Sequence, residues 1–286
     1  MKKILLAGAT GYLGQYLAKE LLSRDYETVL LARNAKKLDV EWARGSQVLQ
    51  AEITQPKTLT GIADGVDTII TTVGITRQKD GLTYMDVDYQ GNRNLLDEAL
   101  RAGVKHFIYI SAINGDKMRH LKIFSAKERF VDELKASGIA YTIVRPNGFF
   151  SDMGDFLEMA KGGRVFLFGD GEYRLNPIHG ADLAKVVVDA VATRPKELIV
   201  GGPDVLSQNE LAALALHAWS KKRKITHLPD WIRRLTIGLM RTFTSSKTYG
   251  PFEFFLTAMA MENVAPTYGN HHLADHFKKE VNRQSN

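Results

Sequence analysis

The sequence predicts an α/β fold built on a doubly wound parallel sheet, with a small and mostly helical part at the C-terminus. Short runs rich in valine and isoleucine alternate with longer segments of helical period through the first half of the chain. A glycine-rich stretch joins the first run to the first helical segment, and the alternation ends at Arg145 and Pro146. Strands that alternate with helices form parallel sheets with helices on both faces, because each crossover is right-handed.

Six strands and four helices are expected before residue 146. The strand runs are bounded by glycine or polar residues, and the helical segments have apolar residues three or four positions apart. The expected strands are residues 3–8, 28–32, 47–51, 68–72, 106–111 and 141–145. The expected helices are residues 12–23, 84–102 and 125–137, with a shorter one near 59–62.

The pattern changes after residue 146. Glycines punctuate residues 161–177, which indicates loops and a short strand, and a helix at 181–192 and a strand at 197–200 follow. Ser207 and Glu210 then have the spacing of a capping box before an apolar run. We expect residues 1–146 to form the core domain, with 175–203 returning to it, and residues 147–174 and 204–286 to form the C-terminal part.

Composition excludes several classes of protein. The chain has 286 residues, of which 44% are hydrophobic, enough for one large α/β domain or two modest ones. It contains no cysteine, so disulfides, thiolate metal sites and cysteine nucleophiles are excluded. The apolar run at the N-terminus ends at Ala7, which fits a buried strand and not a signal peptide. No apolar stretch approaches the roughly 18 residues of a membrane span, so we expect a cytoplasmic protein.

The glycine-rich stretch predicts a dinucleotide site of the Rossmann type. Gly8, Gly11 and Gly14 lie between the first expected strand and the first expected helix. The first glycine suits the tight turn, the second lets backbone approach a diphosphate, and the third lets helix and strand pack closely. The helix N-terminus then faces the anion.

The end of the second expected strand favours NADP(H) over NAD(H). Arg33 lies there, with Lys36 and Lys37 just beyond, and no acidic residue occurs between Thr28 and Leu38. An arginine suits a ribose 2′-phosphate, whereas a 2′-hydroxyl is usually held by a carboxylate. Glu52 follows the third strand, where it would either meet the adenine amino group or lie on the surface.

Lys127 is anomalous on its helix. On a helical wheel it falls inside an apolar arc formed by Ile123, Phe124, Phe130, Val131 and Leu134. A lysine that points toward a core needs a partner or a ligand, unless its stem packs and its amine reaches water. If it contacts a bound cofactor and substrate, its exchange for methionine should preserve or raise the melting temperature, because a buried charge is replaced by an apolar side chain of similar length.

Several motifs resemble the atypical short-chain dehydrogenase/reductase superfamily. They are GATGYLG, VDYQGNRNLLDEAL, FIYISA, the lysine helix and YTIVRP. The stretches RLNPIHGADLA and GGP look like the divinyl chlorophyllide reductase and NmrA-like branches, in which a helical C-terminal part covers the substrate. Active members place a tyrosine and a lysine four residues apart on this helix, and Lys127 matches that lysine.

Active members of the superfamily also use a serine, so that their catalytic set is Ser–Tyr–Lys. The tyrosine is replaced here by Ile123, and Ser111 is followed by Ala112, so the resemblance implies that this set is not intact. The isoflavone-reductase-like and divinyl-reductase-like branches also keep the lysine without that tyrosine. The resemblance therefore implies an NADPH-dependent reductase that transfers hydride to a hydrophobic, conjugated substrate, with Lys127 as the catalytic residue. The alternatives are an NmrA-like NADP(H) sensor without turnover and an assembly factor that docks on a membrane complex.

The motifs and the resemblance together give a set of candidate site residues. The expected cofactor-binding residues are Gly8, Thr10, Gly11, Tyr12, Leu13, Gly14, Arg33, Lys37, Glu52, Thr72, Val73, Gly74, Ser111, Lys127 and Pro146. The expected substrate residues are Phe149, Phe150 and Asn176, although core packing would equally explain the two phenylalanines, and a turn before Pro177 would explain the asparagine. No metal site is expected, because the histidines near the C-terminus have no acidic partner motif.

The positive charge is concentrated in residues 220–247. This segment contains eight basic residues, Arg223 among them, and one acidic residue, Asp230. The whole chain carries a net charge of only +6. Within this segment Trp231, Ile232, Leu235, Leu239 and Phe243 share one helical face, and the arginines share the other. This pattern fits either a helix that packs on its own domain or peripheral contact with a membrane or a protein partner.

No nucleic acid is expected, because the arginines form no recognition motif. The sequence does not define the oligomeric state.

Overall fold

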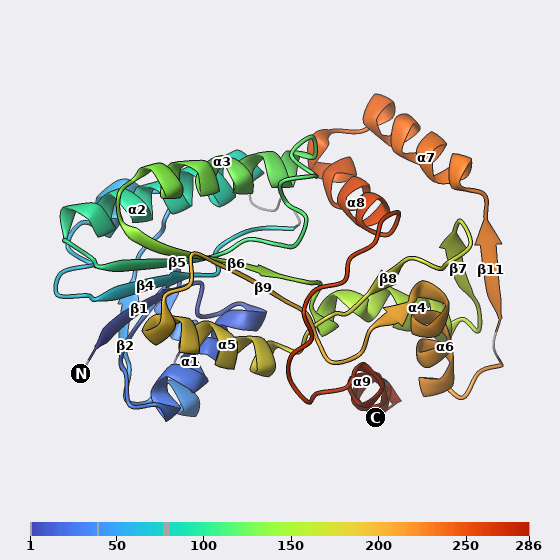
Figure 1. Cartoon of the computed structure of the whole chain (residues 1–286), viewed down its shortest axis with the longest axis horizontal. Coiled ribbons are helices and arrows are strands. Elements are labelled where there is room, and N and C mark those ends of the chain that lie inside the picture. The colour runs from blue at the N-terminus through green and yellow to red at the C-terminus, as the bar shows by residue number, and fades with distance from the viewer. Residues whose placement is uncertain (1, 39, 77–80, 223, 286) are drawn as a thin grey trace. The chain divides into compact units, whose positions relative to one another are not determined.

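The protein is described by a computed structural model that covers residues 2–38, 40–76, 81–222 and 224–285 (Figure 1). The chain divides into two compact units. Unit 1 comprises Met1–Arg145 and Leu183–Leu198, and unit 2 comprises Pro146–Asp182 and Ile199–Asn286. The returning segment is therefore 183–198, which is shorter than the expected 175–203.

Unit 1 is built on the expected parallel sheet. Its described strands follow the order β3-β2-β1-β4-β5-β6-β9, and the pairs from β3 to β6 are parallel. Their bounds are β1 (Lys3–Ala7), β2 (Glu27–Ala32), β3 (Gln47–Gln50), β4 (Thr68–Thr71), β5 (His106–Ile110), β6 (Ala140–Pro146) and β9 (Glu197–Val200). The order reverses between β1 and β4, and this point is where open α/β sheets bind ligands, at the carboxyl ends of the strands.

Helices cover both faces of this sheet (Figure 1). One face carries α1 (Tyr12–Ser23) and α5 (Gly180–Thr193), and the other carries α2 (Asn92–Arg101) and α3 (Lys122–Ala136). Short 3₁₀ turns, η1 (Ala35–Leu38), η2 (Glu41–Ala43) and η3 (Pro56–Leu59), follow β2 and β3. The fold class predicted from the sequence is confirmed.

The long helix expected at 84–102 differs from the prediction. Its first half is a π-helical segment, η4 (Met85–Gly91), which continues into α2. The buried amide of Asn92 donates hydrogen bonds to the carbonyl oxygens of Val87, Asp88 and Val73, and so stabilises the wide turns. Single π-turns of this kind often occur at functional sites.

Unit 2 combines helices with two small sheets. Its described elements are η5 (Phe150–Met153), α4 (Gly154–Lys161), β7 (Val165–Phe168), β8 (Arg174–Leu175), β10 (Leu206–Ser207), α6 (Gln208–Ala218), β11 (Ile225–Leu228), α7 (Asp230–Phe243), α8 (Ser246–Ala258) and α9 (Leu273–Ser285). The β8–β10 pair is antiparallel and the β7–β11 pair is parallel. The prediction of one strand at 161–177 was incomplete, because β8 and β7 each pair with a strand more than 30 residues away in sequence.

The capping box before α6 is confirmed. The Oγ of Ser207 accepts a hydrogen bond from the backbone N–H of Glu210 at 3.2 Å. In return, the N–H of Ser207 donates to Oε2 of Glu210 at 2.8 Å. These reciprocal bonds satisfy two N–H groups that a helix start leaves without partners.

No helix in the described ranges is both long enough and apolar enough to cross a bilayer.

Candidate functional site

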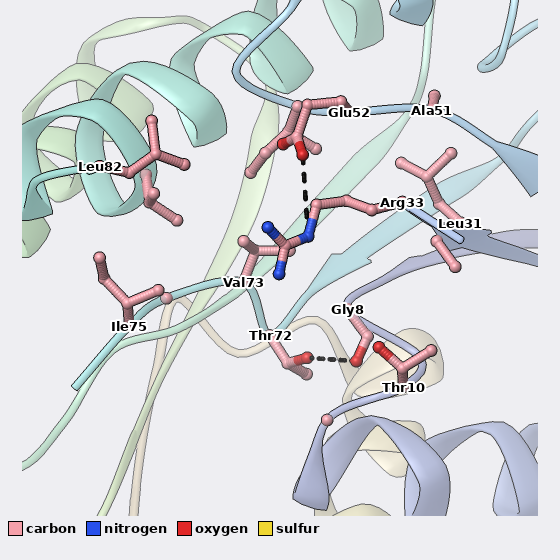
Figure 2. Close-up of a pocket in the computed structure, with 15 residues that line it drawn as sticks. Gly8, Thr10, Leu31, Arg33, Ala51, Glu52, Thr72, Val73, Ile75 and Leu82 are labelled. Carbon is pink, nitrogen blue, oxygen red and sulfur yellow. Dashed lines mark hydrogen bonds and ion pairs between the residues drawn. The ribbon is translucent and has the colours of Figure 1, made fainter. Parts of the chain in front are cut away.

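A cavity of about 320 Å³ lies in unit 1 at the carboxyl ends of β1, β2, β3 and β4 (Figure 2). It is lined by Gly8, Thr10, Gly11, Leu31, Ala32, Arg33, Ala51, Glu52, Ile53, Thr72, Val73, Gly74, Ile75, Leu82 and Val87. This volume is at the small end of the range for ligand pockets. Eight of the expected cofactor residues are in this lining, namely Gly8, Thr10, Gly11, Arg33, Glu52, Thr72, Val73 and Gly74.

The glycine loop has the geometry that a diphosphate requires. Gly8 has a φ of +89°, and a Cβ there would lie 2.4 Å from Oγ1 of Thr72. A Cβ on Gly14 would lie 2.1 Å from the carbonyl oxygen of Gly8, so α1 approaches β1 as closely as the motif predicts. Gly11 is the N-cap of α1, whose first turn carries no acidic residue within the described chain. The backbone N–H groups at this helix start therefore suit an anion.

Arg33 and Glu52 face each other across one side of the cavity (Figure 2). The Nε of Arg33 lies 3.7 Å from Oε2 of Glu52, which is an ion pair without a short hydrogen bond. The arginine side chain is mostly exposed and the glutamate is less so. An exposed guanidinium at the edge of the cavity suits a 2′-phosphate.

The segment after β4 forms another wall of the cavity. Oγ1 of Thr72 donates a hydrogen bond to the carbonyl oxygen of Gly8 at 3.3 Å (Figure 2). Gly74 has no room for a side chain, because a Cβ there would lie 2.6 Å from Oδ1 of Asp88 and 2.7 Å from Nζ of Lys127. Gly74 therefore lies against both charged groups and also lines the cavity.

Lys127 forms an ion pair with Asp88 from η4. The Nζ–Oδ1 distance is 2.7 Å, and the Asp88 side chain is fully buried. Oδ2 of Asp88 also accepts the N–H of Ile75 at 3.1 Å. The lysine side chain is 14% exposed, so the ammonium faces a carboxylate and not bulk water. Lys127 is not among the residues that line the cavity, but its Nζ lies beside Gly74, which is.

Burial and charge act in opposite directions on this pair. Desolvation is the largest single influence and lowers the pKa of Lys127, but the charge and hydrogen-bond interactions with Asp88 and Tyr109 together exceed it, so the net pKa is raised. Desolvation raises the pKa of Asp88 despite the opposing effect of Lys127. The phenol of Tyr109, whose ring centroid is 5.9 Å from the ammonium, has its pKa raised by burial. Lys127 therefore keeps its positive charge in the folded protein.

The other two positions of the usual catalytic set carry no hydroxyl that is free to react. Ile123 is an apolar side chain that is 5% exposed. The hydroxyl of Ser111 donates to Oε1 of Glu128 at 2.9 Å. Glu128 in turn accepts two hydrogen bonds from Arg145, at 2.6 and 2.8 Å, and Arg145 also bonds Glu197. Ser111 thus belongs to a buried ionic network that ties α3 to β5 and β6.

The remaining expected cofactor residues lie outside the cavity lining. These are Tyr12, Leu13, Gly14, Lys37, Ser111, Lys127 and Pro146. Leu13 is buried under α1, and Lys37 is exposed on η1. The sequence prediction missed the apolar lining from Leu31, Ala32, Ala51 and Ile53, which come from the ends of β2 and β3. Position at a strand end was the signal that could have identified them.

The expected substrate residues belong to unit 2. Phe150 is 1% exposed and packs on the rings of His179 and His276, while Phe149 is half-buried. Asn176 is fully buried, and its amide donates to the carbonyl oxygens of Gly202 and Ala265 and accepts from Asn147 and from the N–H of Ala265. Asn176 therefore holds together three loops of unit 2 and has no exposed surface for a substrate.

The sequence is similar to one known family and to two kinds of relative. A sequence profile described as NAD(P)H-binding matches residues 8–194. The chain is 27% identical to a divinyl chlorophyllide a 8-vinyl-reductase from Arabidopsis thaliana, over 97% of this chain and 76% of that protein. It is 28% identical to the photosystem II assembly factor Ycf39 from Guillardia theta, over 79% of this chain and 73% of that protein.

Comparison with solved structures gives the same fold. The NADPH-dependent quinone oxidoreductase QOR2 from Escherichia coli, solved with NADPH, superposes with a TM-score of 0.69. That match covers 99% of this chain and 100% of the other, at 20% sequence identity.

Proposed function

The chain belongs to the NAD(P)H-binding family, and we propose that it is an NADPH-dependent reductase that transfers hydride to a hydrophobic, conjugated substrate. Family membership confirms the expected dinucleotide cofactor, and the relatives confirm the resemblance to the atypical short-chain dehydrogenase/reductase superfamily. The relatives and structural neighbours include reductases and oxidoreductases. The NmrA-like branch and the cytoplasmic location stay predictions.

The residues around the cavity fit this cofactor. The backbone of Gly8 to Gly11 and the start of α1 suit the diphosphate, and Arg33 suits the 2′-phosphate. Thr72 to Gly74 would lie beside the nicotinamide half. When bound, the reduced nicotinamide supplies a hydride.

The observation that carries the proposal is the charged Lys127 beside Gly74. Hydride addition to a conjugated C=C shifts an electron pair onto the conjugated acceptor, where negative charge develops. A fixed ammonium beside that acceptor stabilises the charge, and burial strengthens the effect because the local dielectric is low. Asp88 holds Lys127 protonated and in place. The resulting anion then takes a proton from solvent water, which completes the reduction of the C=C bond. A tyrosine is therefore not needed as proton donor, which agrees with Ile123 at the tyrosine position.

A second candidate is NADP(H) binding without turnover. It is favoured by the hydroxyl of Ser111, which already donates to Glu128, and by the absence of a hydroxyl at Ile123. The relative named as a photosystem II assembly factor adds weight to a role in assembly or regulation. In this case Lys127 would only hold the ribose.

Deuterium transfer distinguishes the two candidates. The full chain is incubated with NADPH that carries deuterium at the nicotinamide C4, and with a panel of conjugated ketones and quinones. We expect deuterium on a product carbon with the wild-type protein and with Lys135→Met, an exposed lysine on the same helix. Lys127→Met should transfer none. If the wild type binds NADPH tightly but transfers no deuterium to any acceptor, the reductase proposal fails and the non-catalytic candidate stands.

A further inference from the structure

Helix α7 exposes a row of large apolar side chains. Trp231, Leu235, Leu239 and Phe243 are four residues apart, and their exposed fractions are 62%, 51%, 49% and 78%. We call these four residues the α7 stripe. The sequence left two alternatives open for this helix, packing on its own domain or peripheral contact. No residue of α7 is buried, and the exposure of these four side chains favours peripheral contact.

The opposite face of α7 makes the contacts within unit 2. Ile237 and Met240 are half-buried there, Ile232 is half-buried at the edge of the stripe's own face, and α7 lies against α8 (Figure 1). Phe252 of α8 is also exposed. One side of α7 thus packs against unit 2, and the stripe on the other side is exposed. Apolar surface of this kind in a folded protein marks an interaction site.

The charges around the stripe are mostly positive. Arg233 and Arg234 both pair with the single carboxylate of Asp230, and Arg241 pairs with Glu253. Arg234 and Arg241 are largely exposed at one edge of the stripe, whereas Arg233 is only 12% exposed. Lys221, Lys222 and Lys224 are exposed just before β11, and Arg223 lies outside the described residues.

We infer that the α7 stripe docks on the surface of an anionic lipid bilayer. A helix with Trp, Leu and Phe on one side and Arg and Lys beside them lies in the interface plane, with its apolar side chains among the acyl chains. Tryptophan favours the level of the headgroups, and arginine reaches lipid phosphates from the same depth. The exposed lysines add attraction to an anionic leaflet.

A second copy of the chain fits the stripe less well. A two-fold interface brings the same surface of both copies together. Two antiparallel α7 helices would place Arg234 of each copy near Arg241 of the other, and like charges across an interface are costly. An anionic bilayer instead complements both arginines.

Vesicle flotation of the full chain tests the docking. We expect the protein to float with vesicles of phosphatidylcholine and phosphatidylglycerol, to float poorly with phosphatidylcholine alone, and to dissociate as salt is raised. Leu235→Ser/Leu239→Ser should weaken the partition into vesicles by at least about tenfold, because two apolar side chains that would enter the bilayer are lost. Leu100→Ser, an exposed leucine on α2, is the matched control and should bind like the wild type.

Two further variants separate the apolar and charged contributions. Trp231→Phe should still bind but should lose the blue shift of fluorescence that vesicles cause, since Trp42 and Trp219 lie outside α7. Lys221→Glu/Lys222→Glu/Lys224→Glu should abolish the preference for phosphatidylglycerol. These lysines are better targets than Arg233, whose nearly buried ion pair would be broken by substitution.

Three results would overturn the inference. The first is no flotation with anionic vesicles at low salt. The second is flotation that Leu235→Ser/Leu239→Ser leaves unchanged. The third is concentration-dependent dimerisation, measured by sedimentation, that the same double variant abolishes while vesicles have no effect; this result would assign the stripe to a second copy.

Discussion

Nζ of Lys127 lies 2.7 Å from Oδ1 of Asp88, and each residue places a charge on the apolar side of its own helical segment. Neither charge would be stable there alone, because burial removes its hydration. Together they form a pair whose cost of desolvation is offset by their attraction and by the N–H of Ile75.

Lys127→Met should lower the melting temperature. The sequence alone predicted unchanged or higher stability, because a buried charge is exchanged for an apolar side chain. The ion pair with Asp88 overturns that expectation. The substitution leaves a buried carboxylate uncompensated, which costs on the order of 3 kcal/mol. Thermal unfolding measures this loss. The double variant Lys127→Met/Asp88→Leu should recover most of it, and a single variant that melts above the wild type would contradict the prediction.

The same substitution should be more harmful at high pH than at low pH. Burial already raises the pKa of Asp88, and removal of Lys127 removes the main opposing influence. A carboxyl whose pKa is raised by folding favours the folded state while it is protonated, and this contribution is lost as the pH rises through the folded pKa. Denaturant unfolding should therefore give a smaller difference between wild type and variant at about pH 4 than at about pH 8. A difference that does not change with pH would argue against an ionised Asp88.

The sequence predicted the parallel sheet because every strand of that sheet is a local apolar run. It did not predict β11, whose residues Ile225–Leu228 are a strand only because β7 lies beside them. The π-helical turns of η4 were also missed, since a helical wheel assumes one fixed angle per residue.

The site was predicted in part for a related reason. Lys127 was recognised as an anomaly on an apolar face, but Asp88 was not, although it lies four residues before the buried Asn92 and seven before Leu95. Opposite charges in two apolar arcs are a detectable signal for a buried pair. The burial of Asn176 could not be predicted, because its partners Gly202 and Ala265 are far away in sequence.

Gly74→Ala should disturb the ion pair and the cavity wall together. The new methyl group would lie within 3.0 Å of both Asp88 and Lys127, so at least one of the two side chains must move. We expect weaker NADPH binding. We also expect the free energy of unfolding to fall by about 1–3 kcal/mol, because the site becomes overpacked. Calorimetry and thermal unfolding measure the two effects. Gly154→Ala is a suitable control, because no atom lies within 4 Å of a Cβ at that helical position. Normal NADPH affinity in Gly74→Ala would mean that the pair does not shape the cofactor site.

Arg33→Ala should remove a preference for NADPH over NADH. If the guanidinium contacts the 2′-phosphate, the wild type should bind NADPH at least about tenfold more tightly, or about 1.4 kcal/mol. The variant should bind both cofactors alike and should keep its melting temperature, because the side chain is mostly exposed. Lys57→Ala, at an exposed lysine on η3 outside the cavity lining, is the matched control. Equal affinities in the wild type, measured by calorimetry, would remove Arg33 from the 2′-phosphate site.

His106 should make the protein less stable in mild acid. Burial lowers the pKa of His106 to about 4, and the positive charges of Arg194 and Lys2 act in the same direction. Its Nε2 lies 2.9 Å from Oγ1 of Thr142, whose own proton goes to the carbonyl oxygen of Pro195. Nε2 must therefore carry the hydrogen of the neutral ring. A proton on Nδ1 has no acceptor, because that buried atom has no hydrogen-bond partner within the described structure.

Between about pH 6.5 and about pH 4 the unfolded chain binds a proton at His106 that the folded chain does not. Stability should therefore fall as the pH is lowered through this window, by at most about 1.4 kcal/mol per pH unit for one histidine. His106→Gln keeps an N–H donor toward Thr142 but does not titrate, so its denaturant midpoint should depend less on pH. Some dependence should remain, because burial also lowers the pKa of His179 to about 4. The exposed His217, changed to Gln, should leave the wild-type slope in place. A slope in His106→Gln equal to that of the wild type would show that His106 is already protonated in the folded protein or exposed to water.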